Sequence, residues 1–216
     1  MKKYFIEAID IIKPNIALIV ILALMPSLMF LSGLALLLSF IMILFLSPTI
    51  HGYFTETILG EKHTSFKEIF KRHALNYYAV ILTLYIPLFV IHRILNYVVG
   101  EVAASAIHTF ISVVIMIFSI YIYPLVFLKR MRMLAIIKGV ACLAGSFRQS
   151  LPLVLLTLLS SAIFTLVTYV FRTFWVKLFP LGLLLSQLPA LFLQFMVFIT
   201  ASLILVKAGV AKKQGL

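Results

Sequence analysis

The chain has 216 residues, of which 64% are hydrophobic and only 11% are charged. Soluble domains are about 45–50% apolar and about 25% charged, so a soluble fold of this size would expose large apolar patches and aggregate. The formal charge of +12 comes from basic residues gathered at the ends of apolar runs, which argues against nucleic-acid binding and indicates a membrane protein. We expect an all-α polytopic protein with one membrane domain over residues 1–216.

Residues 2–13 open the chain with an amphipathic pattern. Phe5, Ile6 and Ile9 recur at three- and four-residue spacing, with Lys3 and Glu7 on the other side. Such a helix lies flat at the level of the lipid headgroups, with its basic side toward anionic lipid. Pro14 ends it, because proline interrupts a helix.

Five apolar runs follow, at residues 16–50, 77–91, 102–128, 151–171 and 178–206. The first would be roughly 52 Å long as one helix, too long for one span. Ser32 and Gly33 lie near its middle, and glycine permits a tight reversal. We predict a helical hairpin there, either crossing fully or re-entrant, which makes six transmembrane helices arranged as three hairpins.

The distribution of lysine and arginine sets the predicted orientation. With a hairpin in residues 16–50 and a cytoplasmic N-terminus, all basic residues except Arg93, Arg172 and Lys177 lie inside. A single crossing would place most of them outside, against the positive-inside rule. The sequence therefore predicts a multi-pass protein of the cytoplasmic (inner) membrane with both termini in the cytoplasm.

A second amphipathic segment, residues 65–73, is also predicted to lie flat in the interface. Ser65 and Glu68 form a capping-box pattern, and Glu68 and Arg72 are spaced to pair. Asn15 lies ten residues after Phe5 and eleven before Pro26, and Asn76 stands in the same register between Phe66 and Pro87. With a looser copy from residue 138 to 150, this indicates approximate repeats over 1–50, 62–128 and 133–206.

The last three spans carry polar side chains at helical spacing. Polar groups in lipid turn toward other helices, so these faces are expected to meet, either as packing contacts or as a path for a small solute. His108 is the one titratable side chain identified well inside a span, and it is expected to be hydrogen-bonded within the packed face; as a proton relay or ligand contact it would need a partner, which Gln187 or Gln194 could supply. The predicted polar path consists of His108, Ser112, Ser119, Thr157, Ser161, Thr165, Gln187 and Gln194.

Basic residues near the helix ends are candidate contacts for lipid headgroups. These are Lys3, Lys13, Lys67, Lys71, Arg72, Arg93, Arg172 and Lys177.

No sequence motif for catalysis, metal or cofactor binding stands out, so we expect a non-enzymatic protein without a cofactor. His51, His63 and His73, with Glu56 and Glu61, occur in one region, but their spacing fits no common ligand motif and predicts a solvated loop. The single cysteine, Cys142, excludes an internal disulfide.

Three short stretches resemble a broad group of prokaryotic six-helix inner-membrane proteins related to the membrane domain of glycerophosphodiester phosphodiesterases. They are Pro48 with His51, Gly52 and Tyr53; Ser65 with Phe66; and Ser146 with Phe147 and Ser150. The resemblance implies interfacial helices between hairpins and a link to the cell envelope. It carries over no catalytic residue, because the phosphodiesterase domain is absent from this sequence.

The leading functional hypothesis is a lipid-interacting membrane protein that supports envelope or lipid handling. A transporter or channel using the polar faces of the last three spans is an alternative, and a subunit of a larger membrane complex is another. The expected partners are membrane lipids, with a homo-oligomer or a second membrane subunit also open.

Overall fold

The computed structural model describes residues 1–30 and 32–209, and every regular element in this part of the chain is a helix. The elements in chain order are α1 (Lys2–Ile12), η1 (Lys13–Asn15), α2 (Ile16–Leu28), α3 (Gly33–Leu59), α4 (Phe66–Val99), α5 (Glu101–Phe118), α6 (Ile122–Lys129), α7 (Leu134–Gly145), α8 (Phe147–Phe174), η2 (Val176–Leu178) and α9 (Phe179–Lys207).

Six helical segments are long and apolar enough to cross a membrane, which confirms the all-α polytopic fold. They are Lys2–Leu28, Gly33–Leu59, Phe66–Val99, Glu101–Phe118, Phe147–Phe174 and Phe179–Lys207. The chain is an integral membrane protein.

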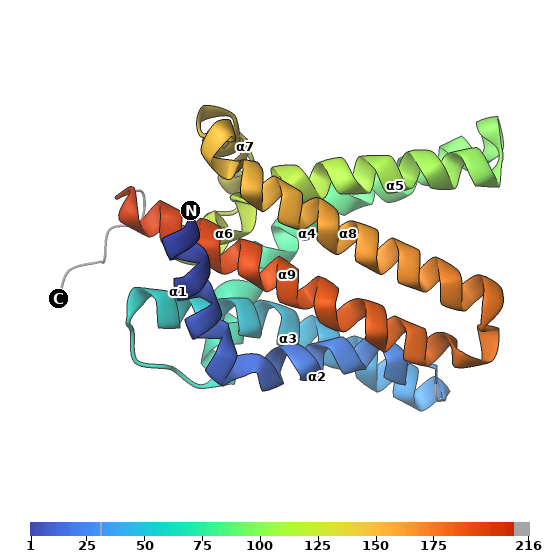
Figure 1. Cartoon of the computed structure of the whole chain (residues 1–216), viewed down its shortest axis with the longest axis horizontal. Coiled ribbons are helices and arrows are strands. Elements are labelled where there is room, and N and C mark those ends of the chain that lie inside the picture. The colour runs from blue at the N-terminus through green and yellow to red at the C-terminus, as the bar shows by residue number, and fades with distance from the viewer. Residues whose placement is uncertain (31, 210–216) are drawn as a thin grey trace.

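The long helices run side by side, and α1 lies across their ends (Figure 1). One end of the bundle holds the start of α1, the α3–α4 loop, α6, α7 and the end of α9 (Figure 1). We call it the basic end, because apart from Arg93, Arg172 and Lys177 the described lysines and arginines lie there. Lys212 and Lys213, also expected on this side, lie outside the described residues. The α2–α3, α4–α5 and α8–α9 connections form the opposite end.

Helix α9 is the central element of the bundle. It packs against α8 and α2, and also contacts α1, α3 and α6. In its most apolar stretch 61% of residues are buried, compared with 6% for α5. The α4–α5 hairpin diverges from α8 and α9 toward the opposite end (Figure 1), so α5 presents most of its surface to lipid.

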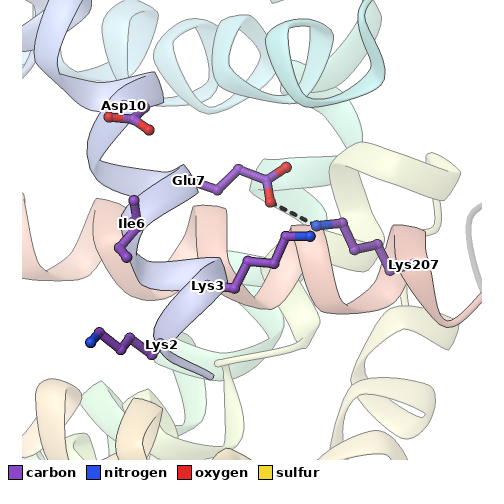
Figure 2. Close-up of a pocket in the computed structure, with 6 residues that line it drawn as sticks. All are labelled: Lys2, Lys3, Ile6, Glu7, Asp10 and Lys207. Carbon is purple, nitrogen blue, oxygen red and sulfur yellow. Dashed lines mark hydrogen bonds and ion pairs between the residues drawn. The ribbon is translucent and has the colours of Figure 1, made fainter.

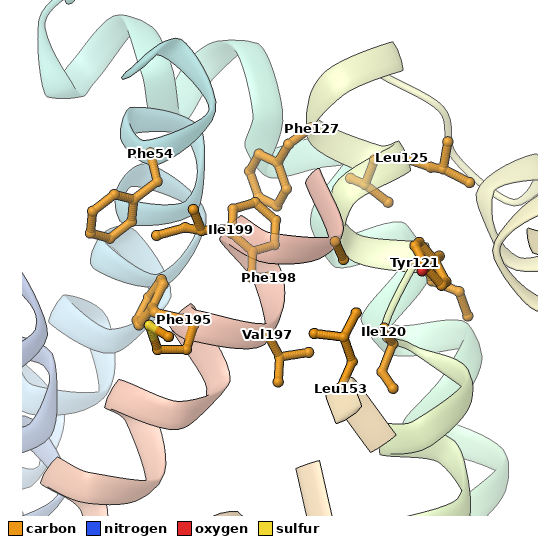
Figure 3. Packing of buried hydrophobic residues seen from close by; sticks show 14 of the residues in the cluster. Phe54, Ile120, Tyr121, Leu125, Phe127, Leu153, Phe195, Val197, Phe198 and Ile199 are labelled. Atoms are coloured by element: carbon orange, nitrogen blue, oxygen red, sulfur yellow. The ribbon is translucent and has the colours of Figure 1, made fainter. Parts of the chain in front are cut away.

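The main hydrophobic core lies in the basic half of the bundle, between α3, α6, α8 and α9. Phe54, Phe127, Phe195 and Phe198 pack around Ile199 on α9 (Figure 3). All five are at most 4% exposed, so this is a close-packed interior rather than a lipid-facing surface.

The predicted hairpin in residues 16–50 is confirmed. Helix α2 ends at Leu28 and α3 begins at Gly33, with the Ser32 side chain accepting a hydrogen bond from the Ala35 amide at 3.1 Å. Helix α2 alone is about 20 Å long, shorter than the roughly 30 Å hydrocarbon layer, whereas α3 is about 40 Å. Helix α3 is therefore long enough to cross fully, and α2 reaches that length only together with η1 and α1, as the segment Lys2–Leu28.

The predicted interfacial helix at residues 65–73 is wrong as a separate element. The capping box of Ser65 and Glu68 is present, but it starts the continuous 34-residue helix α4. In the first predicted repeat, residues 1–50, the helix breaks at Pro14, just before Asn15. The equivalent position in the second repeat is Leu75, just before Asn76, and leucine permits the helix to continue. An unbroken α4 therefore begins at the basic end and runs to Val99.

The third apolar run, residues 102–128, was expected as one span, the fourth of the six, but it is broken at residues 119–121 into α5 and α6. Pro124 favours the break, because a proline ring clashes with the carbonyl four residues earlier, here that of Ile120. Proline is not sufficient by itself, since Pro48, Pro87, Pro152 and Pro189 lie inside unbroken helices. The Tyr121 hydroxyl lies 2.8 Å from Ser150 Oγ, which ties the break to α8.

Helix α7 is held against α6 through a glycine contact that allows one sharp prediction. A Cβ atom at Gly139 would lie 2.8 Å from the backbone nitrogen of Ile122 and 2.9 Å from its Cα. We expect Gly139→Ala to lower the free energy of unfolding by about 1–3 kcal/mol, the usual effect of overpacking. An SDS titration of the purified protein measures it.

Gly145→Ala in the same helix is the matched control. A Cβ there meets nothing within 4 Å, and alanine has the higher helix propensity. This variant should be neutral or slightly stabilised, and equal unfolding midpoints for the two variants would contradict the proposed contact.

Candidate functional site

The polar side chains of α8 and α9 pair with each other along the interface of the two helices. Ser160 donates a hydrogen bond to the Ala190 carbonyl at 3.0 Å and accepts one from Gln194 Nε2 at 3.4 Å. Thr168 donates to Ser186 Oγ at 3.4 Å. Paired hydroxyls of this kind let helices approach closely in lipid.

The other residues of the predicted polar path are spread over different surroundings. Thr157 and Ser119 are buried and donate to carbonyls of their own helices, while Ser161 Oγ lies 3.5 Å from the Met116 sulfur on α5. Ser112 and Gln187 are half-buried and Thr165 is exposed. Helices α8 and α9 therefore meet along their polar faces, as expected, whereas α5 packs mainly against α8 of the two, near its own C-terminal end.

His108 has a partner that the sequence analysis missed. Its ring centre lies 4.7 Å from that of His92 on α4, with 58° between the ring planes. Gln194, one of its two expected partners, bonds to Ser160 instead. The histidine pair lies within the α4–α5 hairpin, in the half of the bundle away from the basic end.

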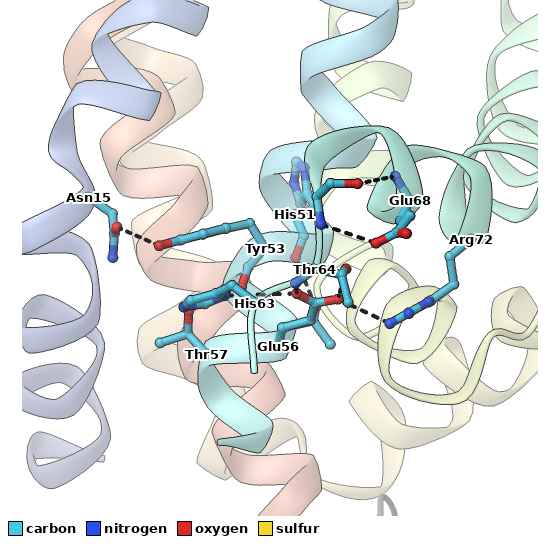
Figure 4. A network of polar contacts seen from close by, with 11 residues as sticks. Asn15, His51, Tyr53, Glu56, Thr57, His63, Thr64, Glu68 and Arg72 are labelled. Carbon is cyan, nitrogen blue, oxygen red and sulfur yellow. Dashed lines mark hydrogen bonds and ion pairs between the residues drawn. The ribbon is translucent and has the colours of Figure 1, made fainter. Parts of the chain in front are cut away.

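The basic end contains a buried carboxylate. Glu56 on α3 is only 2% exposed and accepts hydrogen bonds from Arg72 Nη1 at 3.0 Å, Thr64 Oγ1 at 2.8 Å and the Thr64 amide at 3.1 Å (Figure 4). Arg72 thus pairs with Glu56 rather than with Glu68, which caps α4. A charge taken out of water is stable only when paired in this way, so Glu56 fixes the α3–α4 loop.

Residues from α1 and the loop extend this network. His63 stacks on Tyr53 with ring centres 4.1 Å apart, and its Nδ1 lies 3.8 Å from Glu56 Oε2. The Tyr53 hydroxyl donates to Asn15 Oδ1 at 3.2 Å (Figure 4). Asn15 in turn donates to the Ile11 carbonyl at 3.0 Å, so the network reaches from α4 to the end of α1.

The expectation of a solvated loop around His51, His63 and His73 is wrong for two of the three. His51 lies in α3, where its Nδ1 is 2.7 Å from the Ser47 carbonyl and its ring packs on Phe195 and Phe198. His73 lies in α4 and is 3% exposed. No group of three or more histidine, cysteine, aspartate or glutamate side chains suited to a metal occurs among the residues described.

Asn76 clamps the segment between α6 and α7. Its Nδ2 donates to the Arg130 carbonyl at 3.0 Å, and its Oδ1 accepts from Arg132 Nε at 2.8 Å. Arg130 has φ +51°, a left-handed conformation that costs roughly 1–2 kcal/mol in a residue with a Cβ. The clamp holds this conformation and fixes the direction of the Arg132 guanidinium.

A groove of about 770 Å³ opens between α1 and the end of α9 (Figure 2). Lys207 reaches Glu7 at 2.7 Å and lies 4.7 Å from the centre of the Tyr4 ring, which ties the two helices together. The residues lining the groove are Lys2, Lys3, Ile6, Glu7, Asp10 and Lys207.

The predicted headgroup contacts divide between the two ends. Lys3, Lys13, Lys67 and Lys71 are exposed at the basic end, and Arg72 is half-buried against Glu56. Arg93, Arg172 and Lys177 are exposed at the opposite end, where Arg93 lies 5.3 Å from the centre of the Phe89 ring.

The sequence analysis did not include Lys129, Arg130 and Arg132 among the candidate headgroup contacts, although the structure places them at the basic end with Lys67 and Lys71. All three are exposed between α6 and α7, next to Met133 and Leu134, which are about half exposed. The signal was available, because these residues form the densest basic stretch of the chain and precede an apolar helix.

Comparison of the chain with protein-family models, curated proteins and solved structures finds no match. The resemblance to the membrane domains of glycerophosphodiester phosphodiesterases therefore stays a prediction.

The Glu56 network allows a test of the α3–α4 connection. Glu56→Gln leaves Arg72 without its carboxylate partner, so we expect a loss of about 2–3 kcal/mol in the free energy of unfolding. Arg72 is partly exposed, which keeps the loss below that of a fully buried pair. Glu61→Gln, in the same loop but exposed, is the control. Equal SDS unfolding midpoints for the two variants would contradict this role of Glu56.

Proposed function

We propose that the protein is a non-enzymatic membrane protein that holds anionic lipid headgroups at its basic end and supports envelope or lipid handling. The observation that carries the proposal is the groove between α1 and α9, whose three lysines outnumber its two acids, Glu7 and Asp10. Lys207 pairs with Glu7, and Lys2 and Lys3 of α1 lie in the groove together with an exposed apolar side chain, Ile6. Lysines attract the phosphate of a lipid at the membrane surface, and an apolar side chain can contact the start of its acyl chain.

The position of α1 supports this assignment. It lies across the ends of the long helices (Figure 1), with Ala8 and Ile12 buried against the bundle. Lys2 and Lys3 stand on the groove side (Figure 2), and neither forms an ion pair within the part of the chain that the structure describes. Their charges are therefore free to attract a phosphate.

Arg132 supplies a second contact of the same kind. Its Nε is held by Asn76, which leaves the two terminal nitrogens of a fixed guanidinium for an anion. A fixed guanidinium loses less side-chain entropy on binding than a mobile lysine does. Helix α7 follows directly and exposes Leu134 and Ile137 for contact with lipid.

Two triple variants with equal charge change test the proposal. Lys2→Gln, Lys3→Gln and Arg132→Gln together should weaken retention of phosphatidylglycerol, by about 1 kcal/mol for each basic residue, while binding of phosphatidylcholine is unchanged. Native mass spectrometry of the protein released from detergent measures the bound lipid.

The control triple, Arg93→Gln, Arg172→Gln and Lys177→Gln, carries the same loss of charge at the opposite end. It should retain phosphatidylglycerol like the unmodified protein. A loss confined to this triple, or no loss in either, would contradict headgroup binding at the basic end.

The asymmetry of basic residues also supports the proposal that the basic end and both termini face the cytoplasm of an inner membrane. In a Cys142→Ala background, Lys177→Cys should react with a membrane-impermeant maleimide in intact cells, and Lys62→Cys should react only after the cells are opened. The reverse pattern would overturn the orientation.

A further inference from the structure

The α4–α5 hairpin places two imidazoles side by side, with an amide one helical turn nearer the connection. Gly100, with φ +81°, connects the two helices as a single residue, and His92 and His108 stand eight positions before and after it. Residues equidistant from so tight a turn face each other, and the ring centres are 4.7 Å apart. Both histidines lie about 10 Å from the ends of their helices, which places them inside the hydrocarbon layer near one surface.

Two polar atoms of this hairpin are buried without a partner. They are His92 Nδ1 and Asn96 Oδ1, which belong to one face of α4 because the residues are four apart. Buried polar atoms without a hydrogen bond are rare, because each costs about 1–3 kcal/mol, and each calls for an explanation. Both atoms are good ligands for a cation.

We propose that His92 and His108, with the side-chain oxygen of Asn96, bind a divalent first-row transition metal such as Zn²⁺ or Cu²⁺. Imidazole nitrogens bind these ions at about 2.0–2.1 Å. Two imidazoles on one ion, at an angle of about 90–109°, have ring centres about 4.5–5.2 Å apart by that bond length. The observed 4.7 Å falls in this interval.

The charges around the pair favour a cation. Glu101 lies seven residues before His108, on the same face of α5 and at the mouth of the hairpin. Arg93, the nearest basic residue in sequence, is exposed and lies over the Phe89 ring. No third histidine, cysteine or acidic side chain completes a cluster in the residues that the structure describes, so water supplies the remaining ligands.

The test is metal binding by the purified protein without a histidine tag, since a tag would bind the same ions. Titration with Zn²⁺ should show one ion per chain. Loss of an outer-shell partner alone weakens metal sites about 10–100-fold, so His92→Phe or His108→Phe should weaken binding at least about a hundredfold. His63→Phe, which removes an exposed histidine of the α3–α4 loop, should bind Zn²⁺ like the unmodified protein.

Electron paramagnetic resonance of bound Cu²⁺ provides a test on the unmodified protein, so the proposal can still be decided if a variant does not fold. The unmodified protein should show coupling to two imidazole nitrogens, and His63→Phe should give the same spectrum. An absence of binding, binding that survives the double substitution of His92 and His108, or coupling to fewer than two nitrogens would overturn the proposal. If the two histidines only bond to each other and take up no metal, the purified protein would show no binding of Zn²⁺.

Discussion

The structure depends on one constraint, that polar groups surrounded by hydrocarbon must find their partners within the protein. The backbone meets it by forming helices throughout residues 1–30 and 32–209, apart from the short connections between them. Side chains meet it locally, as where Ser160 joins the Ala190 carbonyl of the neighbouring helix. With its backbone satisfied by the helix, α9 is free to be apolar over most of its length and to serve as the centre of the bundle, although the buried hydroxyls of Thr200 and Ser202 have no partner within the residues described.

The same constraint explains why the charged groups that organise the fold lie at one end. Glu56 is buried with Arg72 and Thr64 where the α3–α4 loop closes, and Asn76 holds Arg132 a turn further along α4. Both contacts join segments distant in the sequence, and both lie where water is near enough to solvate the remaining charge. The basic end therefore lies next to the main hydrophobic core and also exposes Arg132, whose guanidinium is held by Asn76.

Composition and hydropathy were sufficient to predict six apolar helices, the hairpin at Ser32 and the uneven distribution of basic residues. A helix in lipid requires a long run of apolar residues, and such a run is visible in the sequence. The errors came from single residues. Pro14 breaks one segment while Leu75 leaves its counterpart intact, and Pro124 divides a run that hydropathy presents as continuous. The partners of Glu56 and His108 were missed because pairing across helices depends on packing, which spacing within one helix does not reveal.

The Glu56 network and the histidine pair of the α4–α5 hairpin differ in how completely they satisfy their polar groups. Near Glu56 the carboxylate, the guanidinium and the threonine complete one another, whereas His92 and Asn96 each keep a buried atom without a partner. These two unpaired groups lie in the hairpin that diverges from the bundle, beside α5, the least buried span. A ligand that binds between α4 and α5 would therefore gain the full interaction with them, without first displacing a partner within the protein.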